Sequence, residues 1–487
     1  MAVRIASWLL PFWVVLLFTG ASSHGADLLA PLVDLQSDEL TVSAYFALDG
    51  VAVAKLNENK LLNPASVTKI FTAAVALATL GADYTLPTKV SVVGKAPNAR
   101  EIIISTSGDP LLKQEDLEKL AKCVFDAGYK RANALKIVLD PFNSADVPPA
   151  FDRKSTDSAY RAGVAGFQVN RNAIVVSVAP GGAGNPSKVK VTPESDNLRI
   201  VNTAVTAPVG KRPQPTIKVE LAEDGFLEVT VSGRSPGKGS LAVLKRVPNP
   251  ATFAGGVFKA ALRKAGVKVK GQAKVGTSPK NAEVICERSS ATVKELLIPV
   301  MHDSINPIAE TMLRLVGASG RKKPVGFTEG ARALGTWLVE KVGISRNSFK
   351  FTNGSGLYDA NLASARSIVQ LLFYSRASTC CDQLDGLLPV AGKQGTMKKR
   401  FKKTPLEGNL RAKTGTLDDV VSLAGSASLP DGRMLDFAVL INYKPSKGSP
   451  AKMNFATARH AIDKSVLAVW EALALQNPTA ESPVGTK

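Results

Sequence analysis

Apolar and polar residues alternate along positions 40–60, and this pattern predicts a β-hairpin. Two runs, TVSAYFAL and VAVAKL, flank Asp49-Gly50, a dipeptide that favours a tight turn. A strongly apolar stretch then runs from Ser66 to about Leu80 and stops at Gly81. This stretch is long enough for a buried helix, and glycine is a common residue just past a helix end.

The middle of the chain has a different pattern. Residues 100–160 are mixed, with a helix expected near 114–128 and a loop rich in Pro and Asp near 140–157. Residues 165–250 hold short alternating runs between Gly and Pro and predict strands, and residues 251–266 predict a helix. We therefore expect 86–284 to be an inserted region of two smaller domains. One would be about 100–160, and the other the flanking β-rich 86–99 and 161–284.

Helical patterns return after the insert, near 292–301, 306–317, 330–342 and 364–376. The runs VVSLAGSASL and MLDFAVLINY then flank Pro430-Asp431-Gly432 and predict a second hairpin. We expect the last helix to pack on that hairpin, the alternative being a membrane-surface helix, because one face carries Ile462, Val466, Val469, Trp470 and Leu473. Residues 27–85 and 285–480 would then form one α/β (α+β) domain, with 481–487 as a tail.

The first 26 residues have the pattern of a secretory signal peptide. A short basic start with Arg4 precedes the apolar run SWLLPFWVVLLFT, and small residues follow it. The apolar run is too short for a typical membrane span, which disfavours the alternative of an uncleaved anchor. We expect residues 1–26 to be removed and the protein to be periplasmic.

The formal net charge is +20. A basic surface of this kind fits nucleic acid or an anionic cell envelope as a partner. Export excludes nucleic acid as the expected partner and favours peripheral contact with an anionic envelope, although a solvated basic surface that aids solubility explains the charge equally well. The oligomeric state stays open.

The four cysteines are Cys123, Cys286, Cys380 and Cys381. None forms a CxxC pair, and their spacing does not indicate a metal site. Export permits disulfides, and free buried thiols are an equal alternative. A bond between the adjacent Cys380 and Cys381 would be strained.

The chain has only three histidines. His24 would leave with the signal peptide, and neither His302 nor His460 lies in a setting typical of a Ser-His-Asp site. A serine enzyme of this composition therefore needs another base, and lysine is the base that other serine enzymes use.

Ser66-Val67-Thr68-Lys69 opens the predicted buried helix, so that the serine and the lysine share one helix face. The pattern alone is weak, because SxxK also occurs at Ser187/Lys190, Ser235/Lys238, Ser319/Lys322 and Ser449/Lys452. Only Ser66 opens an apolar helix. Burial there disfavours a charged lysine, which suits a base that must be neutral at neutral pH.

Two further motifs complete a candidate site. Lys413-Thr414-Gly415-Thr416 is the only KTG in the chain, and its lysine and threonine hydroxyls could hold a carboxylate next to an edge strand. An SxN motif occurs at Ser195–Asn197, Ser304–Asn306 and Ser345–Asn347. We favour Ser304–Asn306, because it opens the apolar helical run INPIAETMLRLVG, which could bury against the Ser66 helix.

SVTK at 66–69, SIN at 304–306 and KTG at 413–415 together resemble the class C low-molecular-mass penicillin-binding proteins, the D-Ala-D-Ala carboxypeptidase/endopeptidase family. The long gap before SIN is similar to the family's insert, and SGDP at 107–110, NGSGL at 353–357 and LPVAG at 388–392 resemble its flanking text. Ile305, Asn353, Tyr358-Asp359 and Gln394 depart from it. None of these departures falls on a candidate catalytic position.

The resemblance implies a penicillin-binding/serine β-lactamase-like transpeptidase domain with an antiparallel sheet, helices and a β-rich insertion. By resemblance Ser66 is the nucleophile, Lys69 its base and Ser304 a proton relay. Asn306 orients Lys69 and the substrate amide, and Lys413, Thr414, Gly415 and Thr416 bind the terminal carboxylate. Peptidoglycan peptides would be the substrates and β-lactams inhibitors, with no metal or organic cofactor. The alternatives are a serine β-lactamase and a non-catalytic basic envelope-binding protein.

Overall fold

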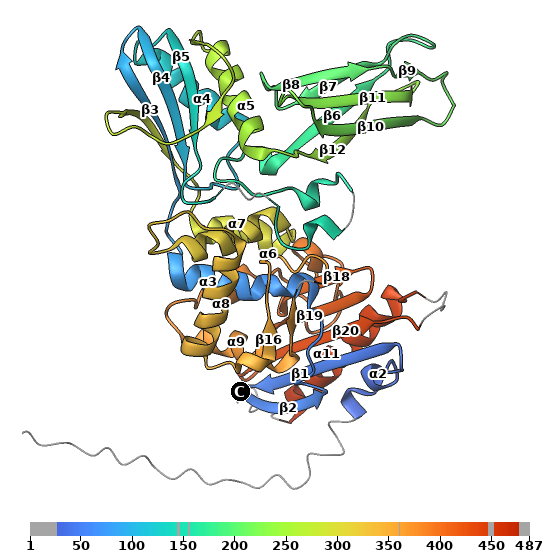
Figure 1. Cartoon of the computed structure of the whole chain (residues 1–487). Coiled ribbons are helices and arrows are strands. Elements are labelled where there is room, and N and C mark those ends of the chain that lie inside the picture. Colours follow the sequence, from blue (N-terminus) through green and yellow to red (C-terminus); the bar gives the residue numbers. More distant parts are fainter. Residues whose placement is uncertain (1–26, 144–146, 154–155, 360, 447–451, 477–487) are drawn as a thin grey trace, which may run out of the picture.

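A five-stranded antiparallel sheet forms the centre of this computed structural model, in the order β18-β19-β20-β1-β2 (Figure 1). The structure describes residues 27–143, 147–153, 156–359, 361–446 and 452–476. The strands are β1 (Leu40–Leu48), β2 (Val51–Leu56), β18 (Arg411–Leu417), β19 (Val420–Ser428) and β20 (Met434–Tyr443). Both predicted hairpins are confirmed, and β1 pairs with β20, so the two ends of the chain share one sheet.

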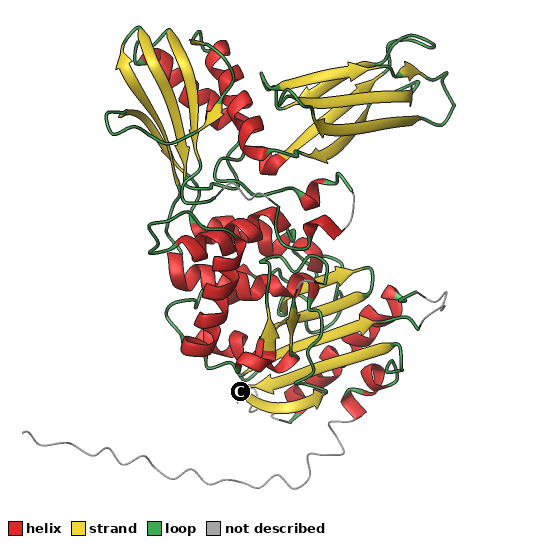
Figure 2. Cartoon of the chain, viewed as in Figure 1, coloured by secondary structure: helices red, strands yellow, loops and turns green. Residues whose placement is uncertain are grey.

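Helices cover both faces of this sheet (Figure 2). Alternate residues of β20 divide between two cores: Ala438 and Leu440 pack on one side, Phe437 and Val439 on the other. The first core holds α3 (Thr68–Leu80), α6 (Val293–His302), α7 (Asn306–Ala318), α8 (Phe327–Trp337) and α9 (Ala365–Ala377). The second holds α2 (Ala30–Val33) and α11 (Phe455–Leu475). The predicted packing of the last helix on the hairpin is confirmed, and Trp470 Nε1 also donates to Ser428 O over 2.9 Å. We call this sheet and its helices the central body.

The first module above the central body is a sheet in the order β13-β5-β4-β3-β15, with β14 also paired to β5. Helices α4 (Gln114–Asp126) and α5 (Pro250–Lys264) pack with it. The strands are β3 (Pro87–Lys95), β4 (Asn98–Thr106), β5 (Arg131–Val138), β13 (Lys268–Val269), β14 (Lys274–Val275) and β15 (Glu283–Ser289). Cys123 on α4 and Cys286 on β15 form a disulfide, with their Cα atoms 6.3 Å apart, whereas Cys380 and Cys381 are free.

The second module consists of two sheets, β12-β6-β7 and β10-β11-β8, with β9 paired to β11. Its strands are β6 (Ala173–Ala179), β7 (Lys188–Thr192), β8 (Leu198–Asn202), β9 (Val205–Thr206), β10 (Gln214–Leu221), β11 (Leu227–Ser235) and β12 (Leu241–Arg246). A two-stranded ribbon of β16 (Phe349–Lys350) and β17 (Leu362–Ala363) lies within the central body.

The expected subdivision of the insert differs from this strand pairing. We expected 86–99 to group with 161–284 and apart from 100–160, yet β3 pairs with β4, and β4 pairs with β5. The expected boundary falls inside β4, because the tight antiparallel hairpin of β3 and β4 was missed. The parallel pairs that join β5 to β13 and β14 connect distant positions, so no local pattern reveals them. The expected signal peptide, residues 1–26, and the tail, residues 481–487, lie outside the described residues. Within the described residues, no helix is both long and apolar enough to cross a bilayer.

Candidate active site

Ser66 and Lys69 lie together at the start of α3. Ser66 is in a short 3-10 turn, Ala65–Val67, and Lys69 is in the first turn of the helix that follows. The Lys69 Nζ is 2.9 Å from the Ser66 Oγ. Lys69 is fully buried, whereas Ser66 is half-buried and lines a cleft. The i, i+3 spacing thus places the two groups in hydrogen-bond contact.

The surroundings of Lys69 disfavour its charged form. Burial is the main cause that lowers the Lys69 pKa well below its ordinary value, and the nearby positive charge of Lys413 lowers it further. The Glu310 carboxylate acts in the opposite direction. The Lys69 Nζ also contacts the Asn306 Oδ1 over 2.8 Å and the Ser355 carbonyl oxygen over 2.7 Å.

Ser304 and Asn306 lie at the junction of α6 and α7, beside Lys69. Ser304 has a φ of +60°, a strained conformation for a non-glycine residue, and Asn306 is the first residue of α7. The Asn306 Nδ2 donates to Tyr160 O over 3.2 Å, while its Oδ1 faces Lys69. The favoured SxN motif therefore lies at the site.

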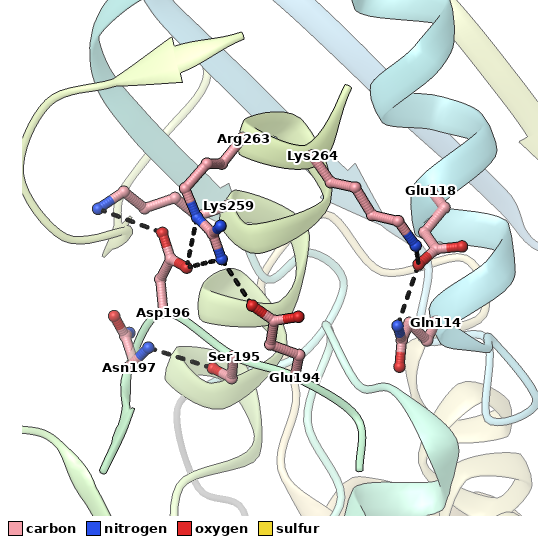
Figure 3. A network of polar contacts seen from close by, with 9 residues as sticks. All are labelled: Gln114, Glu118, Glu194, Ser195, Asp196, Asn197, Lys259, Arg263 and Lys264. Atoms are coloured by element: carbon pink, nitrogen blue, oxygen red, sulfur yellow. Dashed lines mark hydrogen bonds and ion pairs between the residues drawn. The ribbon is translucent and has the colours of Figure 1, made fainter. Parts of the chain in front are cut away.

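The other two SxN motifs lie elsewhere. The Ser195 Oγ donates to Phe253 O over 3.3 Å, and the Asn197 Nδ2 donates to Thr252 O over 3.1 Å. Figure 3 shows this segment against α5, where Asp196 pairs with Arg263. Ser345 is an exposed residue before a 3-10 turn at Arg346–Ser348. Both motifs make local structural contacts rather than contacts with Ser66.

The KTG segment forms the edge strand β18. The Lys413 Nζ contacts the Ser304 Oγ over 3.0 Å and the Thr414 carbonyl oxygen over 2.9 Å. The side chain is fully buried, and burial lowers the pKa of Lys413 to about 7. The Thr414 Oγ1 is 2.8 Å from the Thr396 Oγ1, and Thr416 is exposed in the cleft.

Gly415 allows β18 to lie against the Ser66 turn. A Cβ at this position would lie 2.7 Å from Pro64 O and 2.1 Å from the Ser422 Oγ, which itself donates to Pro64 O. Any side chain at Gly415 would therefore push the strand away from the serine.

Glu310 is a site residue to which the sequence analysis gave no role. Its carboxylate is fully buried on α7 and accepts hydrogen bonds from the Gly354 N–H over 2.9 Å and the Ser355 N–H over 2.8 Å. It thereby fixes the loop whose Ser355 carbonyl contacts Lys69. A lone carboxylate in the apolar run INPIAETMLRLVG was the available signal. No pattern in the sequence pointed to Tyr160, which comes from the insert.

The cleft above Ser66 has a volume of about 900 Å³. Its described lining contains no histidine, which fits a lysine base. The lining includes three carboxylates, those of Asp359, Asp418 and Asp419, and the side chain of Tyr358. Burial raises the pKa of Tyr358 to about 12, with the Tyr160 side chain contributing. The lining residues are Ser66, Tyr160, Ser304, Asn306, Leu357, Tyr358, Asp359, Thr416, Leu417, Asp418, Asp419, Tyr443, Pro445, Lys452, Met453 and Phe455.

Three comparisons relate this chain to known proteins. The model of the D-Ala-D-Ala carboxypeptidase 3 (S13) family matches residues 26–462. The chain is 30% identical over 409 residues to a D-alanyl-D-alanine carboxypeptidase of an Actinomadura species, covering 78% of this chain and 73% of the relative. It is 25% identical over 405 residues to D-alanyl-D-alanine carboxypeptidase DacB of Haemophilus influenzae, covering 80% and 82%.

The fold is also that of a solved structure, penicillin binding protein 4 (dacB) from Haemophilus influenzae. The TM-score is 0.77 at 22% identity, with 92% of this chain and 99% of the other covered. This confirms the expected penicillin-binding fold. The family match spans most of the chain and includes all three motifs of the site. The chain belongs to the D-Ala-D-Ala carboxypeptidase 3 (S13) family of serine peptidases.

Proposed function

We propose that this enzyme cleaves the terminal D-Ala–D-Ala bond of peptidoglycan stem peptides through an acyl-enzyme on Ser66. The observation that carries this mechanism is the contact between the Ser66 Oγ and the Lys69 Nζ, on a lysine whose pKa is lowered by burial. The family match supports the reaction class. The residue roles are our assignment from the geometry.

Neutral Lys69 is oriented to act as the base. Its Nζ has three polar neighbours, and two of them, the Asn306 Oδ1 and the Ser355 carbonyl oxygen, only accept hydrogen bonds. A neutral amine gives its two N–H groups to these acceptors, and its lone pair then faces the Ser66 hydroxyl. Asn306 thus orients Lys69, which takes the proton as Ser66 attacks the substrate carbonyl.

Backbone N–H groups of Ser66 and Thr416 are proposed to form the oxyanion hole. A donor of this kind typically contributes about 10²–10³ in rate. Ser304, which contacts Lys413, then passes its hydroxyl proton to the leaving amine, and the proton that Lys69 took from Ser66 replaces it. Water hydrolyses the acyl-enzyme in the last step.

The terminal carboxylate is assigned to the β18 end of the cleft. The Thr416 hydroxyl lines the cleft and can donate to it directly, and Gly415 keeps that strand beside Ser66. Thr414, whose hydroxyl contacts Thr396, lies outside the cleft lining and is assigned a supporting role. Lys413 is fully buried, so we assign its effect to charge carried through Ser304. Its charge is present below a pH of about 7 in the free enzyme.

β-Lactams should acylate the same serine. The Haemophilus influenzae structure with this fold has also been solved in complex with a novel β-lactam. For this chain we propose a slowly hydrolysed adduct, in contrast to the fast turnover of a β-lactamase. We further propose that the chain is exported to the periplasm, because residues 1–26 have the pattern of a signal peptide.

Cleavage of a D-Ala-D-Ala peptide tests the function. Purified wild type should release D-alanine, and Ser66→Ala should lose at least about a thousandfold in rate. A wild type that releases no D-alanine and does not label with a fluorescent penicillin would favour a non-catalytic binding protein. Rapid nitrocefin turnover would favour a β-lactamase.

Cross-linked muropeptides test for D,D-endopeptidase activity, the second activity that we propose. The cleft of about 900 Å³ has room for more than a terminal dipeptide, and we propose D,D-endopeptidase activity as a second activity. Chromatography of digested cross-linked dimers should show monomers. Digestion of uncross-linked pentapeptides alone would restrict the enzyme to carboxypeptidase activity.

A further inference from the structure

Three segments of the second module, residues 181–190, 203–214 and 233–240, meet at the end of the module that bears β9 (Figure 1). The Gly181 N–H donates to the Thr206 Oγ1 over 2.9 Å, and the Ala207 N–H donates to Ser235 O over 3.1 Å. The Ser187 and Ser235 hydroxyls are 2.7 Å apart. We call these three segments the tip surface.

The tip surface carries positive charge only. Its three segments contain no Asp or Glu, and the six basic residues are all exposed. None of the six forms an ion pair with another residue in the part of the chain that the structure describes. They are Lys188, Lys190, Lys211, Arg212, Arg234 and Lys238.

The carboxylates of the same module lie away from the tip surface, and most are paired. Glu194 and Asp196 pair with Arg263 of α5 at 2.6 and 3.2 Å (Figure 3). Asp224 and Glu228 both pair with Arg199. The module is therefore polarised, with balanced charge next to α5 and unbalanced cations at the far end. A basic surface that served solubility alone would not require this separation.

Exposed valines accompany these cations. Val209 is 74% exposed in the loop that continues into Lys211-Arg212, and Val205 on β9 is 42% exposed. Apolar side chains beside Lys and Arg are typical of a protein surface that lies in a membrane interface, where the cations meet anionic headgroups and the aliphatic groups enter the acyl boundary. A soluble polyanion would engage the cations and leave the valines in water.

We propose that the tip surface docks the enzyme peripherally on an anionic lipid bilayer. Binding to vesicles of phosphatidylcholine with phosphatidylglycerol, measured by sedimentation, tests this directly. We expect binding at low salt, little binding to phosphatidylcholine alone, and weaker binding at high salt.

Matched charge variants locate the surface. Lys211→Gln, Arg212→Gln and Lys238→Gln together should weaken vesicle binding about a hundredfold, since each cation near an anionic surface contributes roughly fivefold. Arg321→Gln, Lys322→Gln and Lys323→Gln remove the same charge from an exposed loop of the central body. That control should change binding by less than about threefold. Equal loss in both triples would show that net charge alone drives binding and would overturn the proposal.

The variant Val209→Ser distinguishes a lipid bilayer from a soluble polyanion as the partner of the tip surface. We expect it to weaken vesicle binding about tenfold, because the buried aliphatic group is lost. No effect of Val209→Ser, together with full displacement by polyphosphate, would overturn the lipid assignment in favour of an anionic polymer. Absence of wild-type binding to the anionic vesicles would also overturn it. The rate of penicillin labelling should be unchanged in every variant and reports that each is folded.

Discussion

The surroundings of Lys69, the proposed base, control its charge. Burial lowers its pKa, Lys413 lowers it further, and Glu310 raises it. The sequence predicted the Ser66–Lys69 pair, because the i, i+3 spacing at a helix start needs only local geometry. The sequence could not reveal that the Ser355 carbonyl contacts Lys69, or that Glu310 fixes the loop of Ser355. These residues come together only through tertiary packing.

The substitution Glu310→Gln should move the acid limb of the profile of acylation rate against pH to lower pH. The lost negative charge no longer favours protonated Lys69, so the lysine pKa falls and the neutral base persists at lower pH. Lys69 and Lys413 are the charged groups that act in this pocket. The measurement is the rate of β-lactam acylation against pH.

Thr311→Val is the matched control for Glu310→Gln. It removes a buried hydroxyl from the same helix. This hydroxyl donates to Pro307 O over 2.9 Å and accepts from the Gln168 Nε2 over 3.2 Å, whereas Lys69 contacts other groups. Both variants should unfold at lower temperature, and only Glu310→Gln should shift the limb. A slower reaction with an unshifted limb would show that Glu310 acts on the loop alone.

The alkaline limb of the pH profile of kcat/KM for peptide cleavage should depend on Lys413. Its pKa of about 7 means that the free enzyme carries this positive charge at lower pH and loses it as pH rises. The kcat/KM for a peptide with a free terminal carboxylate should therefore fall above a pH of about 7. A terminal amide, which lacks the negative charge, should show no such fall, and equal falls for both substrates would contradict the assignment.

Two of the three SxN motifs, those of Ser304 and Ser195, can be compared by one pair of variants. Ser304→Ala should slow penicillin labelling by about 10²-fold or more, because the hydroxyl between Lys413 and the substrate is lost. Ser195→Ala should label at the wild-type rate, because Ser195 contacts α5 instead. The reverse pattern would show that the catalytic role belongs to the Ser195 motif.

At the scale of elements, the hydrophobic pattern predicted most helices and both main hairpins. Alternation identified β1, β2, β19 and β20, and the apolar run after Ser66 identified α3. The pattern did not predict how all strands of the insert pair, because β13 and β14 join β5 by parallel contacts across a long stretch of chain. It also left the cysteine pairing open, since that depends on how α4 packs against β15.

The disulfide between α4 and β15 should stabilise the first module. The double substitution Cys123→Ala and Cys286→Ala should lower the free energy of unfolding by about 2–5 kcal/mol. Differential scanning calorimetry would detect the change, and penicillin labelling at room temperature should persist, because the bond lies outside the cleft. Cys380→Ala, at a free thiol, is the control. Equal melting temperatures for the two variants would contradict this stabilising role.

At the scale of the molecule, two modules lie above the central body, and the segment that connects β5 of the first to β6 of the second contributes a residue to the candidate cleft. Tyr160, which precedes β6, lines the cleft and holds Asn306 through its carbonyl oxygen. The sequence analysis assigned no site residue to the insert, and this contact adds one. Local patterns could not show it, because Tyr160 and Asn306 meet only after the chain has folded back on itself.

The most direct test of Ser66 as nucleophile is to locate the penicilloyl group after trypsin digestion. Cleavage after Lys60 and Lys69 gives the peptide LLNPASVTK, which holds Ser66. Mass spectrometry of the labelled enzyme should place the adduct on Ser66 in this peptide, and Ser66→Ala should carry none. An adduct at another residue, or equal labelling of Ser66→Ala, would contradict the mechanism.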